Sequence, residues 1–178
     1  MLKSDETDGI VGDWGDVESC PTGEYVIGYR LRSEGPQGAG PGANDDTALN
    51  AIELICSGGS TITSAAGDWG TYGASVSCPS GAVDGFKVRI DRVNDNDMTG
   101  AVDIDLFCQD DTKISAPGNN DWGEWTADLR CPTGQAATGL QTRVQAPQGG
   151  ADAEDDTALN GMRLKCEEYI SKFNIYSI

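Results

Sequence analysis

The sequence predicts an all-β protein built from three copies of one unit. Apolar and polar residues alternate with a period of two in Phe86–Ile90, Val102–Cys108 and Met162–Cys166, as expected of strands with one buried face. No window keeps the spacing of an amphipathic helix, and 24 glycines and 7 prolines divide the chain into short segments. The pattern recurs about every 55 residues, which indicates one supersecondary unit used three times.

Four short motifs define the repeat. An Asp-Trp-Gly motif stands at Asp13–Gly15, Asp68–Gly70 and Asp121–Gly123. A Cys-Pro-x-Gly motif follows at Cys20–Gly23, Cys78–Gly81 and Cys131–Gly134. A glycine then opens an alternating segment, at Gly28, Gly85 and Gly139. An apolar run finally ends at a second cysteine, at Cys56, Cys108 and Cys166.

The six cysteines are predicted to form disulfides within the repeats. Six cysteines allow 15 pairings, and repeat symmetry favours Cys20–Cys56, Cys78–Cys108 and Cys131–Cys166. Zinc is the rival use of paired cysteines, but its sites use Cys-x2-Cys spacings or histidine, and the chain has neither. Disulfides predict an oxidising compartment, so we expect a secreted, extracellular protein.

The repeats are expected to form a single domain over residues 1–178. A unit of this size is too small to bury a core by itself. We place the repeats at about 10–59, 60–111 and 112–168, with a C-terminal tail at 169–178. Short strands are expected after the closing cysteines, at Thr61–Thr63 and Lys113–Ser115. The first repeat has no similar strand before Trp14, so Tyr169–Ser171 is predicted to fill that place.

The charge and the missing motifs exclude several classes of function. Twenty-nine acidic residues against 12 basic ones give a net charge of −17, which repels nucleic acid and favours basic partners. No apolar stretch is long enough for a membrane helix, and the acidic start of the chain does not resemble a signal peptide. The chain lacks histidine, a phosphate loop and calcium-loop spacing, so no cofactor and no metal are predicted.

The combined motifs resemble those of the vitelline membrane outer layer protein I family over residues 10–168. Beyond the motifs above, the resemblance rests on Pro36–Gly38 with Asn44–Asn50 and on Pro147–Gly149 with Asp155–Asn160. It implies a β-prism I fold, in which three four-stranded antiparallel Greek-key sheets surround a pseudo-threefold axis. It also implies an extracellular coat role and an ability to rearrange N-acetylchito-oligosaccharides. Repeat two departs from the pattern at Asn94–Gly100.

Two pairs of adjacent aspartates, Asp45 with Asp46 and Asp155 with Asp156, are candidate ligand contacts. One hypothesis is structural, because Asp and Asn in turns accept hydrogen bonds from nearby backbone N–H groups. The other is that both pairs meet at one end of the prism and bind glycan hydroxyls. Glycosyl transfer requires two carboxyls about 5–9.5 Å apart, and Asp46 and Asp156 are the candidates for that role.

The tryptophans support two further expectations. Trp14, Trp69 and Trp122 repeat with the Asp-Trp-Gly motif, which is typical of large rings that fill a shared core. Trp125 has Tyr72 and Val17 at its place in the other repeats, so it breaks the symmetry and is the better candidate for stacking on a sugar.

The leading interpretation is therefore a secreted structural component of a coat or matrix, with affinity for glycans such as N-acetylglucosamine oligomers. Its partners would be glycans or coat and matrix proteins, basic ones included. The alternatives are an enzyme resembling a chito-oligosaccharide transglycosylase and an interaction module resembling a lectin or toxin. The sequence leaves the choice between enzyme and non-enzyme open, although the non-enzymatic interpretation is favoured.

Overall fold

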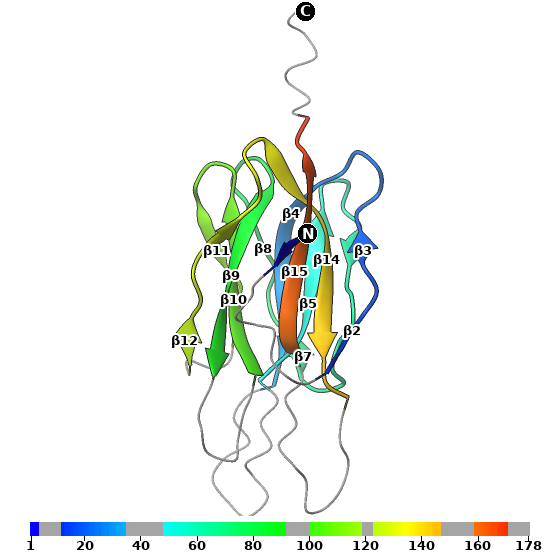
Figure 1. Cartoon of the computed structure of the whole chain (residues 1–178), viewed down its shortest axis with the longest axis vertical. Helices are drawn as coiled ribbons and strands as arrows, with labels where there is room; N and C mark the ends of the chain where they lie inside the picture. The colour runs from blue at the N-terminus through cyan, green and yellow to red at the C-terminus, as the bar shows by residue number, and fades with distance from the viewer. Residues whose placement is uncertain (4–11, 35–47, 92–99, 119–122, 147–158, 171–178) are drawn as a thin grey trace, which may run out of the picture.

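Three antiparallel sheets form the molecule, as the computed structural model in Figure 1 shows. The structure describes residues 1–3, 12–34, 48–91, 100–118, 123–146 and 159–170. These residues contain strands, turns and bends but no helix. The prediction of an all-β fold with three sheets is confirmed.

Each sheet is built around one long hairpin. The hairpins are β4 (Val26–Ser33) with β5 (Leu49–Cys56), β9 (Val83–Asp91) with β10 (Gly100–Cys108), and β14 (Gln135–Val144) with β15 (Leu159–Glu168). Their alternating apolar residues point inward from all three sheets and meet in one core. We name each sheet by its two long strands.

Short strands complete each sheet. One short strand pairs with the second long strand of each sheet: β6 (Thr61–Ile62) with β5, β11 (Lys113–Ser115) with β10, and β1 (Leu2–Lys3) with β15. Along the first long strand run β7 (Thr71–Tyr72) with β8 (Val76–Ser77), β12 (Glu124–Trp125) with β13 (Leu129–Arg130), and β2 (Asp13–Trp14) with β3 (Glu18–Ser19). In the β9–β10 sheet the order β11-β10-β9-β12 is that of a Greek key whose fourth strand is split in two.

The repeated glycine of the long strands allows the split strand to pass closely. A Cβ atom on Gly28 would overlap the backbone oxygen of Val76. The same overlap would occur between Gly85 and Leu129, because the two sheets have the same arrangement. A side chain at these positions would push the fourth strand away, which explains why each alternating segment opens with glycine.

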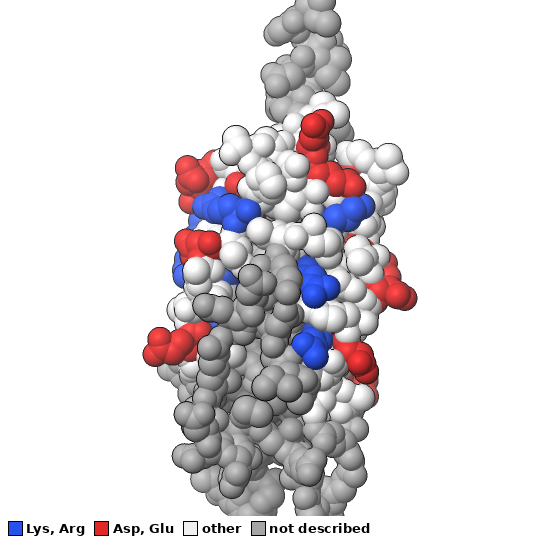
Figure 2. Space-filling model, viewed as in Figure 1, with Lys and Arg blue, Asp and Glu red and all other residues white. Residues whose placement is uncertain are grey.

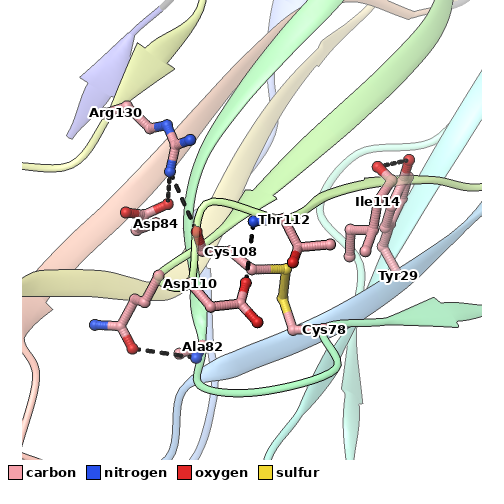
Figure 3. Close-up of a disulfide and its surroundings, with 10 residues drawn as sticks. Tyr29, Cys78, Ala82, Asp84, Cys108, Asp110, Thr112, Ile114 and Arg130 are labelled. Carbon is pink, nitrogen blue, oxygen red and sulfur yellow. Dashed lines mark hydrogen bonds and ion pairs between the residues drawn. A yellow bond between two sulfur atoms is a disulfide. The ribbon is translucent and has the colours of Figure 1, made fainter.

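The split fourth strand of each sheet comes from another repeat: the next one along the chain for the first two sheets, and the first repeat for the β14–β15 sheet. For example, β7 and β8 precede Cys78 in sequence but pair with β4 of the β4–β5 sheet. Cys78 therefore lies at the end of one sheet, and its partner Cys108 ends β10 of another. The disulfide in Figure 3 thus joins two sheets, although both cysteines belong to one repeat.

All three disulfides have the predicted pairing, and together they link the sheets in a ring. The Cys20–Cys56 bridge joins the β14–β15 sheet to the β4–β5 sheet, and Cys131–Cys166 joins the β9–β10 sheet to the β14–β15 sheet. All six cysteines are paired. In the chain-entropy model each loop of this size contributes about 3–4 kcal/mol to stability.

The predicted place of Tyr169–Ser171 is wrong. The third sheet is completed by β1, in which Leu2 lies opposite Leu164 and Lys3 opposite Arg163. Leu2 packs against the core, so two residues at the start of the chain supply the strand that seemed to be missing. Tyr169 instead packs its ring edge-on against Tyr25, at 4.8 Å between centroids, and Ser171 lies outside the described residues.

Candidate functional site

The two ends of the prism differ. We call the end of the prism where β4, β9 and β14 finish and β5, β10 and β15 begin the loop end (Figure 1). The opposite end, where Cys56, Cys108 and Cys166 close the repeats, is the disulfide end. Covalent links therefore hold the disulfide end of the prism.

The aspartate candidates Asp45, Asp46, Asp155 and Asp156 lie outside the described residues. The structure describes the last residue of each of their motifs, Asn50 and Asn160, and both are buried. The Asn50 carbonyl accepts the Gly67 N–H at 2.8 Å, and the Asn160 side-chain oxygen lies against Gly100. Both asparagines therefore lie at the loop end, and the roles of the four aspartates stay predictions.

Three aromatic side chains occupy equivalent positions on the outer faces of the sheets. Trp14 lies opposite Arg143, Tyr72 opposite Arg32, and Trp125 opposite Arg89 in the strand pairings. A glycine with positive φ stands two residues before each ring, at Gly12, Gly70 and Gly123. Trp125 therefore does not break the threefold symmetry, because Trp14 and Tyr72 are its counterparts.

The prediction that the repeated tryptophans fill the core is wrong. Trp69 is 50% exposed, Trp14 is half-buried on an outer face, and Trp122 lies outside the described residues. The Asp-Trp-Gly motif does not mark equivalent positions in the three repeats. Its tryptophan in the first repeat, Trp14, occupies the position that lies three residues after the motif tryptophan in the other two repeats. The distance to the first cysteine is the better signal, since Trp14, Tyr72 and Trp125 each stand six residues before it.

Smaller rings and aliphatic side chains fill the core instead, and three of them occupy matching positions in the three repeats. Tyr29, Phe86 and Leu140, each following the repeated glycine, are fully buried. Apolar side chains from all three sheets surround them, with Leu31, Val88, Ile52, Ile104, Met162, Leu54, Leu106 and Leu164 among them.

A basic side chain lies over each outer aromatic ring. The distance from the cation to the ring centroid is 3.7 Å for Arg163 at Trp14, 4.4 Å for Arg30 at Tyr72 and 4.5 Å for Lys87 at Trp125. These are cation–π distances, and each contact holds the ring against its sheet. These basic partners could not be predicted from the sequence, because each belongs to a different repeat from the ring that it covers.

Trp125 is the most accessible of the three rings. Its side chain is 37% exposed, whereas Trp14 and Tyr72 are half-buried. The Arg163 guanidinium is close enough to Trp14 to cover one ring face in van der Waals contact. At Trp125 the second cation, Arg89, is 6.0 Å from the centroid. The structure thus keeps Trp125 as a candidate for ring stacking and adds Trp69, which is more exposed still.

The β9–β10 sheet also carries two carboxyls beside these rings. Asp103 lies opposite Arg89 and Asp105 opposite Lys87, so both stand on the outer face. Asp105 is buried: its carboxylate bonds to Lys113 at 2.8 Å, and Ser115 donates a further hydrogen bond. Burial and these partners separate Asp105 from any ligand, so the two carboxyls do not form a glycosidase pair that could contact a substrate.

Asp103 is half-buried, and its environment favours the protonated form. Burial raises the pKa of this carboxyl from 3.8 to about 6, and the charge of Asp105 adds to the rise. The Ile104 N–H donates to Asp103 Oδ1 at 2.8 Å, and Arg89 and Lys113 oppose the rise. The Asp103 carboxyl therefore changes charge near pH 6.

Basic side chains gather around the three rings. In Figure 2 basic side chains lie in the middle and at both sides of the visible face, and acidic ones lie mostly along its margins and its upper end. Half of the twelve basic residues of the chain adjoin the three rings: Arg30, Arg32, Lys87, Arg89, Arg143 and Arg163. The basic residues of the chain are thus concentrated around the three rings.

Within the described ranges, no group of three or more Cys, Asp or Glu side chains is arranged to hold a metal ion. The same residues include no helix of the length and apolar character that a membrane span requires.

Comparison with known proteins identifies the family. The family model described as vitelline membrane outer layer protein I matches residues 2–172. The chain belongs to this family. It is 38% identical over 168 residues to a vitelline membrane outer layer protein 1 homolog from Mus musculus, covering 89% of this chain and 79% of the relative. The homolog from Homo sapiens is 39% identical over 165 residues, covering 87% and 77%.

Solved structures show the same fold at low sequence identity. A prostate-specific WGA16 glycoprotein lectin matches with a TM-score of 0.57 and 14% identity, covering 89% of this chain and 92% of that one. A mannose-binding jacalin-related lectin from Ananas comosus matches with a TM-score of 0.53 and 12% identity, covering 90% and 93%. These similarities establish the β-prism fold of this member of the vitelline membrane outer layer family.

Proposed function

We propose that the protein is a secreted structural component of an extracellular coat or matrix, and that it binds N-acetylglucosamine oligomers at the loop end. Its family and its fold support a structural protein with carbohydrate binding. The ring of disulfides supports an extracellular setting, because such bonds persist under oxidising conditions.

The observation that carries the proposal is the exposure of two tryptophans toward the loop end. Trp69 is 50% exposed and Trp125 is 37% exposed, although large aromatic side chains are usually much more buried. The Trp69 N–H points to the side-chain oxygen of Asn50, the second residue of β5, which places Trp69 at the loop end. An exposed, fixed ring offers an apolar face to a pyranose at little cost in side-chain entropy.

The related folds support the same class of ligand. The matched neighbours include the mannose-binding lectin from Ananas comosus, and frutalin from Artocarpus incisa, solved with galactose, has a TM-score of 0.52 and 10% identity. The four aspartate candidates of the loop-end motifs, Asp45, Asp46, Asp155 and Asp156, are proposed to supply hydrogen-bond acceptors there. Their order in the sequence gives each pair a place between a glycine-rich segment and a long strand.

The proposal can be tested by calorimetric titration of the protein with N-acetylchitotriose. Trp69→Ala and Trp125→Ala are each expected to weaken binding about tenfold, because loss of one stacked ring removes about 1–2 kcal/mol. Ile170→Ala is the matched control, since Ile170 is 65% exposed but bonds to Tyr25 at the disulfide end. The control should bind as the unaltered protein does.

Two outcomes would contradict the proposal. One is that the unaltered, folded protein gives no heat of binding and no other sign of binding at millimolar trisaccharide. The other is equal binding by all three variants, which would show that the exposed tryptophans are not in contact with the sugar.

A further inference from the structure

Three side chains form a row across the outer face of the β9–β10 sheet. Trp125 on β12 lies opposite Arg89 on β9, and Arg89 lies opposite Asp103 on β10. The three therefore stand at one level of three adjacent strands, with Arg89 between the ring and the carboxyl. We call them the Trp125 row.

The polar members of the row keep bonding capacity toward solvent. Arg89 donates its Nε–H to the carbonyl of Gly123 at 3.1 Å, which fixes the guanidinium beside β12. Asp103 Oδ1 accepts the backbone N–H of Ile104, and the carboxyl is half-buried. A guanidinium has five N–H donors and a carboxylate about four acceptor sites, so the bonds named here use only part of this capacity.

The row occurs in one of the three sheets. In the β4–β5 sheet the equivalent positions are Tyr72, Arg32 and Ala51, because Ala51 lies opposite Arg32. In the β14–β15 sheet the third position is Gly161, opposite Arg143. Among the described residues, a carboxyl therefore stands directly opposite the arginine of this row only in the β9–β10 sheet.

The charges around the row favour an uncharged ligand. Arg89 faces Asp103, and Lys87 lies 3.5 Å from Asp105, which Lys113 also contacts. Positive and negative groups thus alternate on this face without a large excess of either. A pyranose with neighbouring hydroxyls matches such a surface, because one hydroxyl can accept from a guanidinium and the next can donate to a carboxylate.

We propose that the Trp125 row is a sugar subsite, in which a neutral pyranose stacks on Trp125 while Arg89 and Asp103 bind two of its neighbouring hydroxyls. This inference rests on the proposed function and assigns the polar contacts of its site. It also predicts that, of the three equivalent aromatic positions, only Trp125 contacts the sugar.

The test is a set of titrations with N-acetylchitotriose at about pH 7.5, where Asp103 is ionised. Asp103→Asn keeps the size of the side chain and an oxygen for the Ile104 N–H, but removes the negative charge. Arg89→Lys keeps the positive charge but removes the planar guanidinium group and its several N–H donors. Each is expected to weaken binding about tenfold, the effect of one lost hydrogen bond to a charged group.

Arg143→Lys is the matched control, because Arg143 Nε donates to Gly12 just as Arg89 Nε donates to Gly123. It should leave the affinity within about twofold. The indole N–H resonance of Trp125 without sugar shows whether Arg89→Lys has moved the ring.

The two proposals fail in different ways. Absence of binding by the unaltered protein contradicts the glycan-binding function and this assignment with it. Binding that needs the exposed tryptophans but is unchanged in Asp103→Asn and Arg89→Lys contradicts the assignment alone. Equal losses in Arg143→Lys and Arg89→Lys would also overturn it, because the effect would then not be specific to this face.

Discussion

The hydroxyl of Tyr29 accepts the backbone N–H of Ala116 at 2.8 Å in the centre of the core. The same hydroxyl donates toward the carbonyls of Ile104 and Ile114, so one side chain of the β4–β5 sheet is bonded to the β9–β10 sheet (Figure 3). Burial raises the pKa of the Tyr29 hydroxyl above its usual range. A buried polar group with several partners thus joins two sheets at the disulfide-bonded junction.

Tyr29→Phe is expected to lower the free energy of unfolding by about 1–3 kcal/mol, because the Ala116 N–H would stay buried without a partner. Urea denaturation followed by fluorescence measures the change. Tyr72→Phe is the control, since Tyr72 lies on an outer face, and it should change stability by less than about 0.5 kcal/mol. Equal stability of the two variants would show that the buried hydroxyl contributes nothing.

Removal of one inter-sheet disulfide should destabilise the whole prism. Cys78→Ala combined with Cys108→Ala opens the ring of three links, and we expect a loss of about 2–5 kcal/mol. Peptide mapping of the unaltered protein without reduction should give the three pairs within the repeats. A bridge between repeats, such as Cys56 with Cys78, would contradict the described topology.

The strand β1 is expected to contribute to stability despite its length of two residues. Leu2→Asp would place a charge where Leu2 packs against the core beside β15, and should cost about 1–3 kcal/mol. Val17→Asp is the matched control, because Val17 is 47% exposed beside the split strand of the same sheet. A melting temperature equal in both variants would show that β1 is not needed to close the sheet.

Asp103 should make stability depend on pH. Its pKa of about 6 in the folded protein exceeds the ordinary 3.8, so the folded state binds the proton more tightly. The resulting stabilisation is complete below the ordinary pKa and is lost as the pH rises through about 6. Because Asp103 is only half-buried, we expect about 1–2 kcal/mol after screening by solvent.

The comparison of the unaltered protein with Asp103→Asn isolates this effect from the other carboxyls. Melting temperatures at about pH 4 and about pH 7.5 should show the variant gaining relative stability at the higher pH. A difference between the two proteins that is constant across this range would contradict the raised pKa.

The fold could be predicted from the sequence because its determinants are local and repeated. Alternation placed the long strands, and the symmetric cysteines gave the pairing. The pairing of β7 and β8 with the sheet of the preceding repeat could not be predicted from alternation. Strands of two residues are too short to show an alternating pattern. The same shortness hid β1 and led to the wrong place for Tyr169.

The candidate site was less predictable, because its parts come from different repeats. Trp125 was found, but for a reason that the structure overturns, since Trp14 and Tyr72 are its counterparts. Arg89 and Asp103 look like ordinary polar residues of alternating strands. Only the strand register brings them beside Trp125.

The indole N–H resonances of the four tryptophans give the most direct test of glycan binding by the exposed rings. On titration of the labelled, disulfide-bonded protein with N-acetylchitotriose, the Trp69 and Trp125 resonances should shift and saturate together, assigned through Trp→Phe variants. The Trp14 resonance should stay in place, because Arg163 covers its ring. A saturating shift of Trp14 alone, or no shift of any indole at millimolar sugar, would contradict the account.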